Sequence, residues 1–168
     1  MLFVKREVLL PLFFSSDLAS ELGYESQPKD KMTVISEGYR KVCTINEVRE
    51  KGGKKPVIIN GVEGGILVVE PEEGGKVYAC DVYSTAYKYP LMDGEVRKDS
   101  NYGDRWVIES PLDGTIYDLS SGKVLKWCPG DTAGRKLLGM LKRDVKPTDL
   151  QTYRATVEDK QVFVKLSD

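Results

Sequence analysis

The chain of 168 residues contains no histidine, and this absence excludes more functions than any other feature of its composition. Without an imidazole, the polypeptide alone cannot form a Ser-His-Asp or Cys-His nucleophile pair or the common catalytic zinc sites. Its three cysteines, Cys43, Cys80 and Cys128, are too few and too scattered for a four-thiolate cluster, a zinc ribbon or a disulfide-rich secreted scaffold. We therefore expect a protein from a reducing compartment that is not an enzyme and holds no metal or cofactor.

An excess of charge and a long apolar run are also missing. The 25 basic and 26 acidic residues leave a net charge of −1, which supplies no field that would attract nucleic acid, so we expect no nucleic-acid partner. Residues 1–14 are apolar, but Lys5, Arg6 and Glu7 interrupt them. They are too short to span a bilayer, which takes about 20 apolar residues.

The N-terminal residues 1–31 are predicted to form a docking or anchor segment, ahead of one domain at 32–168. Two interpretations of residues 1–14 stay open, because the segment either docks on a partner or the lipid headgroup layer, or covers the domain's own sheet. A short helix is expected at 16–22. The candidate partner-binding residues of this segment are Leu9, Leu10, Phe13 and Phe14.

From Met32 onward, short β-branched runs bounded by Gly, Pro and Asn predict an antiparallel β fold. A second helical segment is expected at 131–143, although Gly134 and Gly139 weaken it. The predicted strands lie at 33–35, 40–45, 57–59, 65–69 and 76–80, and the chain closes with a hairpin of 150–157 and 161–166.

Two motifs lie between residues 80 and 124, reading CDVYSTAYKYPLMDGEV and, after a charged spacer, WVIESPLDGTIYDLSSGKV. They resemble the two cluster-binding loops of a Rieske iron–sulfur domain, which carry a C-x-H and a C-x-x-H element. On this chain the four ligand slots fall on Cys80, Val82, Ser110 and Asp113. Only Cys80 is a usable ligand there, so the resemblance implies a Rieske fold whose cluster site is degenerate.

The resemblance implies an all-β, Rieske-like antiparallel β-sandwich with the two loops adjacent at one end. In ligated members these loop tips dock on an electron-transfer partner, so Tyr83, Tyr87, Tyr89 and Leu112 are candidate partner-binding residues. The half-motif Trp127-Cys128-Pro129 is similar to part of a thioredoxin W-C-x-x-C, and Cys128 is interpreted as either a redox thiol or a packing thiol. A disulfide between Cys80 and Cys128 stays open.

Within the superfamily, the chain is similar to the cluster-lacking Rieske-like proteins associated with photosystem II in thylakoids. That similarity implies a non-catalytic structural or assembly subunit of a photosynthetic membrane complex, located at the chloroplast thylakoid, with peripheral membrane association, or otherwise soluble and intracellular. Two alternatives stay open: a ligand-free small subunit of a reductase such as nitrite reductase, and an electron-transfer protein whose metal is shared with a partner.

Deleting residues 1–14 distinguishes the two interpretations of the N-terminus. Burying a large apolar side chain is worth about 1.5–3 kcal/mol, so a segment that packs on its own domain should lower the melting temperature by several degrees when removed. We expect instead that the melting temperature is unchanged and that association with membranes or a complex is lost. A truncated protein that melts earlier and still co-purifies with its partner contradicts the docking interpretation.

Overall fold

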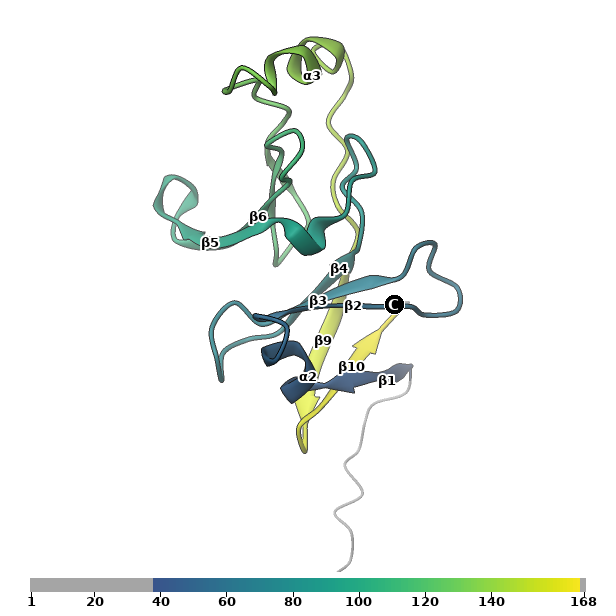
Figure 1. The fold of residues 1–168 in the computed structure, drawn as a ribbon. Helices are drawn as coiled ribbons and strands as arrows, with labels where there is room; N and C mark the ends of the chain where they lie inside the picture. Colours follow the sequence, from purple (N-terminus) through teal and green to yellow (C-terminus); the bar gives the residue numbers. More distant parts are fainter. Residues whose placement is uncertain (1–37, 167–168) are drawn as a thin grey trace, which may run out of the picture. The chain divides into compact units, whose positions relative to one another are not determined.

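The computed structural model describes residues 38–166, which form two antiparallel β-sheets with few helices (Figure 1). This confirms the predicted all-β class. The larger sheet has the strand order β1-β10-β9-β4-β3-β2 and the smaller one β5-β6-β7-β8. Among the described residues no helix is long and apolar enough to cross a bilayer. The elements are β1 (Tyr39–Thr44), α2 (Ile45–Arg49), β2 (Lys54–Val57), β3 (Ile66–Val69), β4 (Tyr78–Asp81), η1 (Leu91–Asp93), β5 (Glu95–Asp99), η2 (Ser100–Tyr102), β6 (Arg105–Glu109), β7 (Ile116–Asp118), β8 (Val124–Lys126), α3 (Lys136–Leu141), β9 (Thr152–Glu158) and β10 (Gln161–Lys165).

Most strands expected from apolar alternation are present, and β1, β3, β4, β9 and β10 begin and end within two residues of the predicted ranges. The strand expected at 57–59 instead begins at Lys54 and pairs with β3 as far as Val57. Ile58 then lies 91% exposed, outside the sheet. The strand expected at 33–35, the helix expected at 16–22, the boundary at 31 and Leu9, Leu10, Phe13 and Phe14 all lie outside the described residues.

Several elements were not predicted, among them the hairpin of β5 and β6 and the helix α2. The charged spacer between the two motifs lies within the hairpin of β5 and β6, in which Arg97 bonds Glu109 across the strands at 3.0 Å. Residues 45–49 leave the strand and form the helix α2. The Thr44 side chain and the Glu47 carboxylate each accept a hydrogen bond from the other residue's backbone N–H, which caps the start of this helix. The hydrogen bonds from Lys55 and Thr44 lower the pKa of Glu47 to about 2.

Strand β3 contributes side chains to two hydrophobic clusters, because both of its faces are buried. Ile66 and Val68 point into a cluster with the β1–β10 side of the large sheet, whereas Leu67 and Val69 point into a second cluster. This second cluster, defined here as the inter-sheet core, contains residues of both sheets. Its buried members are Leu67, Val69, Cys80, Val82, Leu91, Ile108, Tyr117, Leu119 and Leu150.

A turn at Gly122 ties β7 to the segment before β9, and its geometry allows a matched prediction. Gly122 has φ +73°, donates its N–H to the Asp118 carbonyl at 2.8 Å and accepts from the Leu150 N–H at 2.8 Å. A Cβ here would overlap the Leu150 carbonyl, whereas one at Gly52, with φ +70°, would meet nothing within 4 Å. We expect Gly52→Ala to lower the free energy of unfolding by about 1–2 kcal/mol and Gly122→Ala by about 3–5 kcal/mol. Urea denaturation measures both, and equal losses would contradict the close approach to Leu150.

Candidate functional site

The two loops that carry the Rieske-like motifs have the same backbone hydrogen bonds. In the first loop, residues 82–90, the Ser84 N–H donates to the Tyr89 carbonyl at 2.8 Å, and the Lys88 N–H donates to the Ser84 carbonyl at 3.1 Å. In the second loop, residues 110–115, the Ser110 N–H donates to the Thr115 carbonyl at 2.8 Å, and the Gly114 N–H donates to the Ser110 carbonyl at 3.0 Å. The geometry therefore makes Ser84 of the first loop the equivalent of Ser110 in the second.

This equivalence corrects the sequence alignment of the first loop. Cys80 lies within β4, opposite Leu67 and Thr152, and packs in the inter-sheet core, where burial raises its pKa to about 12. Val82 packs in the same core. When the C-x-H element starts at Ser84, the equivalent of Ser110, its two ligand slots fall on Ser84 and Ala86. The placement of these slots on Cys80 and Val82 is therefore wrong.

The misplacement has a physical cause. Cys80 is the cysteine closest in sequence to the first loop, and a cysteine is the ligand expected there. The sequence motif was therefore aligned on Cys80. The backbone signal that would have corrected it is hidden, because the left-handed residue of the first loop is Lys88, with φ 52°, where the second loop has Gly114, with φ 76°. A glycine is the usual sequence marker of such a turn, and lysine is not.

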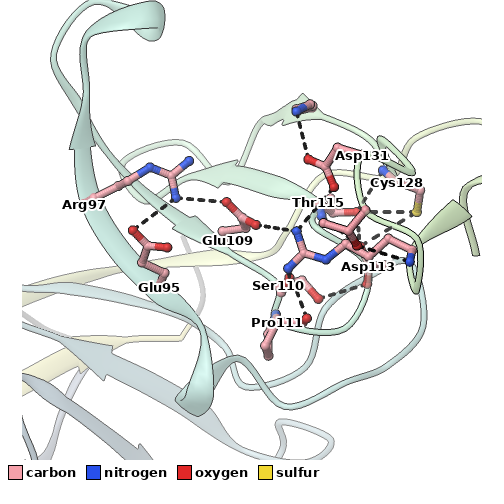
Figure 2. A network of polar contacts seen from close by, with 12 residues as sticks. Glu95, Arg97, Glu109, Ser110, Pro111, Asp113, Thr115, Cys128 and Asp131 are labelled. Atoms are coloured by element: carbon pink, nitrogen blue, oxygen red, sulfur yellow. Dashed lines mark hydrogen bonds and ion pairs between the residues drawn. The ribbon is translucent and has the colours of Figure 1, made fainter.

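The second loop encloses a buried polar network around Asp113 (Figure 2). The fully buried Asp113 carboxylate accepts from the Ser110 hydroxyl at 2.9 Å, from the Thr115 N–H at 2.9 Å, and from the Thr115 hydroxyl. The Cys128 thiol lies 3.8 Å from the same carboxylate, and the Cys128 N–H donates to the Thr115 hydroxyl at 3.2 Å. The side chains at the predicted ligand positions Ser110 and Asp113 therefore bond each other.

A segment of residues 129–143, which we call the cap, is anchored on both loops by polar contacts. The Arg135 guanidinium bonds Glu109 at 2.7 Å and donates to the Pro111 carbonyl at 3.1 Å. On the first loop, the Tyr87 hydroxyl donates to the Leu138 carbonyl at 2.7 Å. The expected helical segment at 131–143 is thus present only as α3, and it holds the two loops.

The first loop is also joined to the small sheet. The Thr85 N–H donates to the Tyr117 hydroxyl at 3.0 Å, and the Thr85 hydroxyl donates to the Thr148 carbonyl at 2.6 Å. Tyr117 is fully buried, and burial raises its pKa. The two loops consequently lie at one end of the described domain, next to β7 and the cap (Figure 1).

The candidate partner-binding residues of the loops divide into two pairs. Tyr83 and Tyr89 are exposed, at 39% and 37%. Tyr87 and Leu112 are half-buried, and the Lys142 ammonium lies 4.9 Å from the centre of the Tyr87 ring. Contacts within the domain therefore occupy Tyr87, whereas Tyr83 and Tyr89 are available on the surface.

The cysteines give no support to redox chemistry or to a disulfide. All three cysteines are free and buried, so Cys80 and Cys128 form no disulfide in this structure. Burial raises the pKa of Cys128, so its thiol is a poor nucleophile at neutral pH. Its contacts with Thr115 and Asp113 match the packing interpretation.

The residues in the four revised slots do not fit a [2Fe-2S] cluster. Ser84 and Ser110 offer hydroxyls, Ala86 offers no donor atom, and Asp113 offers a carboxylate that already accepts hydrogen bonds. Iron in such a cluster takes thiolate and imidazole ligands. Among residues 38–166, no group of three Cys, Asp or Glu side chains is placed to hold a metal ion.

Comparisons with known proteins agree with the fold. The Erwinia carotovora nitrite reductase [NAD(P)H] small subunit is 17% identical, with a TM-score of 0.55 over 79% of this chain and 85% of its own. NirD of E. coli is 15% identical, with a TM-score of 0.53 over 75% and 94%. The Sphingomonas yanoikuyae B1 ferredoxin is 20% identical, with a TM-score of 0.51 over 76% and 98%.

No curated protein matches the chain. None of these three structures is described as part of a photosystem, a thylakoid or a chloroplast. The family model that does match, described as a Rieske-like [2Fe-2S] domain, covers residues 38–165. That range includes both sheets, both loops and the cap. The chain belongs to the Rieske-like [2Fe-2S] domain family.

Proposed function

We propose that the chain is a non-catalytic, protein-binding subunit of a redox assembly, built on a Rieske fold without its cluster. The observation that carries the proposal is the second loop, where Asp113 is buried and hydrogen-bonded to Ser110 and Thr115 in place of ligands facing a metal. A loop whose polar groups satisfy one another serves stability, and the function then depends on the outer surface of the loops.

The exposed part of the first loop provides that surface. Tyr83 borders a hollow of about 800 Å³, whose other polar lining includes Asp81, Lys88 and Tyr153. The Tyr153 hydroxyl donates to Asp81 at 2.7 Å, so two of the residues that line the hollow are bonded to each other. Tyrosine at the rim of a hollow supplies a large contact area with a polar end, and such residues dominate many protein interfaces.

The class of partner follows from the similar structures. Nitrite reductase small subunits and ferredoxins share the fold, which supports a redox enzyme or its electron-transfer proteins as the partner. The narrower hypothesis of a photosystem subunit at the thylakoid rests on the sequence resemblance alone. An electron carrier with a metal shared with its partner is the remaining alternative.

The first test is spectroscopic. The full chain, purified anaerobically from a host that assembles iron–sulfur clusters, is expected to contain neither stoichiometric iron nor labile sulfide and to show no visible absorption, because the slots lack thiolate and imidazole. The Sphingomonas ferredoxin prepared in parallel is the control. Iron with sulfide in the isolated chain would contradict the proposal, and a visible spectrum that forms only in the complex would favour the shared metal.

The same proposal is tested on the surface of the first loop, by affinity capture from native extract and mass spectrometry. We expect Tyr83→Ser combined with Tyr89→Ser to lose at least tenfold of the captured partner, because side chains of this kind are common hot spots. Val157→Ser is the control, since Val157 is equally exposed, at 38%, on β9. Undiminished capture by the tyrosine variant would remove these residues from the interface.

A third prediction concerns the buried network. Asp113→Ala leaves the Thr115 N–H and the Ser110 hydroxyl without their acceptor, and we expect the free energy of unfolding to fall by about 2–5 kcal/mol. The exposed Asp144, replaced by Ala, should change it by less than about 0.5 kcal/mol. Denaturation in urea measures both variants, and an Asp113 variant as stable as the wild type would show that the network does not hold the loop.

A further inference from the structure

The outer surface of the cap carries three large apolar side chains in water. Leu137, Met140 and Leu141 are 64%, 62% and 64% exposed. They follow the spacing i, i+3 and i+4 within α3, so they occupy one face of the helix. Exposed apolar residues that occur singly need no explanation, but a group of this kind marks an interaction surface.

The opposite face of α3 explains why these side chains point away from the domain. That face approaches the domain so closely that a Cβ at Gly139 would lie 2.9 Å from the Cys128 carbonyl oxygen. The anchoring contacts are polar, from the Arg135 guanidinium and through the Leu138 carbonyl. The usual arrangement of a surface helix, with its apolar face toward the core, is therefore inverted here.

Basic side chains lie beside the apolar face, and the exposed Asp144 is the one acidic residue among residues 136–146. Lys136, Lys142 and Arg143 line a hollow of about 480 Å³ together with Met140 and Trp127. Within the described residues, neither Lys136 nor Arg143 forms an ion pair, whereas the Lys142 ammonium lies over the Tyr87 ring. The exposed Lys146 follows four residues after Lys142 and is likewise without an acidic partner there. These cations are available to an external anion.

We propose that the outer face of the cap docks on an anionic lipid surface. Leu137, Met140 and Leu141 enter the boundary between headgroups and acyl chains, and Lys136, Arg143 and Lys146 contact the headgroup phosphates. Apolar residues flanked by Lys and Arg are the pattern of interfacial binding, and each basic residue near an anionic surface adds attraction. Trp127 beside the hollow is also typical of the interface.

The attachment is peripheral. Six residues of helix measure about 9 Å, far below the hydrocarbon thickness of about 30 Å. The proposal goes beyond the protein-binding function and does not depend on it, because the surface lies on the cap and the exposed tyrosines lie on the first loop. An acidic protein groove is the competing occupant, and binding of the wild-type chain to vesicles separates the two.

The test is flotation of the full chain with vesicles of phosphatidylcholine alone and with vesicles half phosphatidylglycerol. We expect binding to the anionic vesicles only, weakened by salt. Leu137→Ser combined with Met140→Ser and Leu141→Ser should reduce the partition coefficient at least tenfold. Arg143→Gln combined with Lys146→Gln should reduce it about fivefold for each charge removed.

Two matched controls keep the result specific to the cap, and circular dichroism verifies that every variant is folded. Ile58→Ser removes an apolar residue that is 91% exposed elsewhere, and Lys51→Gln combined with Lys123→Gln removes two exposed charges elsewhere. Both controls should bind as the wild type does. No binding of the wild type to anionic vesicles would overturn the proposal in favour of a protein occupant, and equal binding by the cap variants would place the membrane contact outside the cap.

Discussion

The carboxylate of Asp113 is fully buried, and the conformation of the second loop follows from the need to satisfy it. Ionised or neutral, a buried carboxyl group without partners is costly, so the chain must supply donors around it. Ser110 and Thr115 do so from the two ends of the loop, and Cys128 approaches from beyond β8. These contacts fix where the loop ends, and hence where β7 begins and where the cap can attach.

Hydrogen bonds restrain the two loops at several separate points. A cluster would hold both loops at one point. Here the first loop is bonded to Tyr117 and Leu138, whereas the second is held from within by Asp113 and from outside by Arg135. Each such bond contributes only about 0.5–1.5 kcal/mol net, so the loops depend on many small terms. Loss of one contact should loosen one part of the site, whereas a metal centre is lost as a whole when a ligand is removed.

The fold could be predicted from the sequence where a strand has a buried and an exposed face, or buried apolar residues on both, as β3 has. It could not be predicted at β5 and β6, because the charges that suggest a spacer are paired across the strands, as Arg97 is with Glu109. In the site, spacing alone predicted Ser110 and Asp113 as the slots of the second loop, and in the structure these two side chains bond each other. Cys80 was misplaced because residue identity outweighed backbone geometry, which is visible only through the hydrogen bonds of Ser84 and Lys88.

The short helix of the cap was predicted from the sequence, but the direction of its apolar face was not. Gly139, which lowers helix propensity, is the residue that lets α3 lie against Cys128, and the leucines that suggest a core helix lie outside. The inner contacts of the cap use a guanidinium and a backbone carbonyl, and the outer face uses apolar side chains. Because the two sets share no atom, substitutions on the outer face leave the anchors of the loops intact, so a change in surface binding there is separable from a change in the fold.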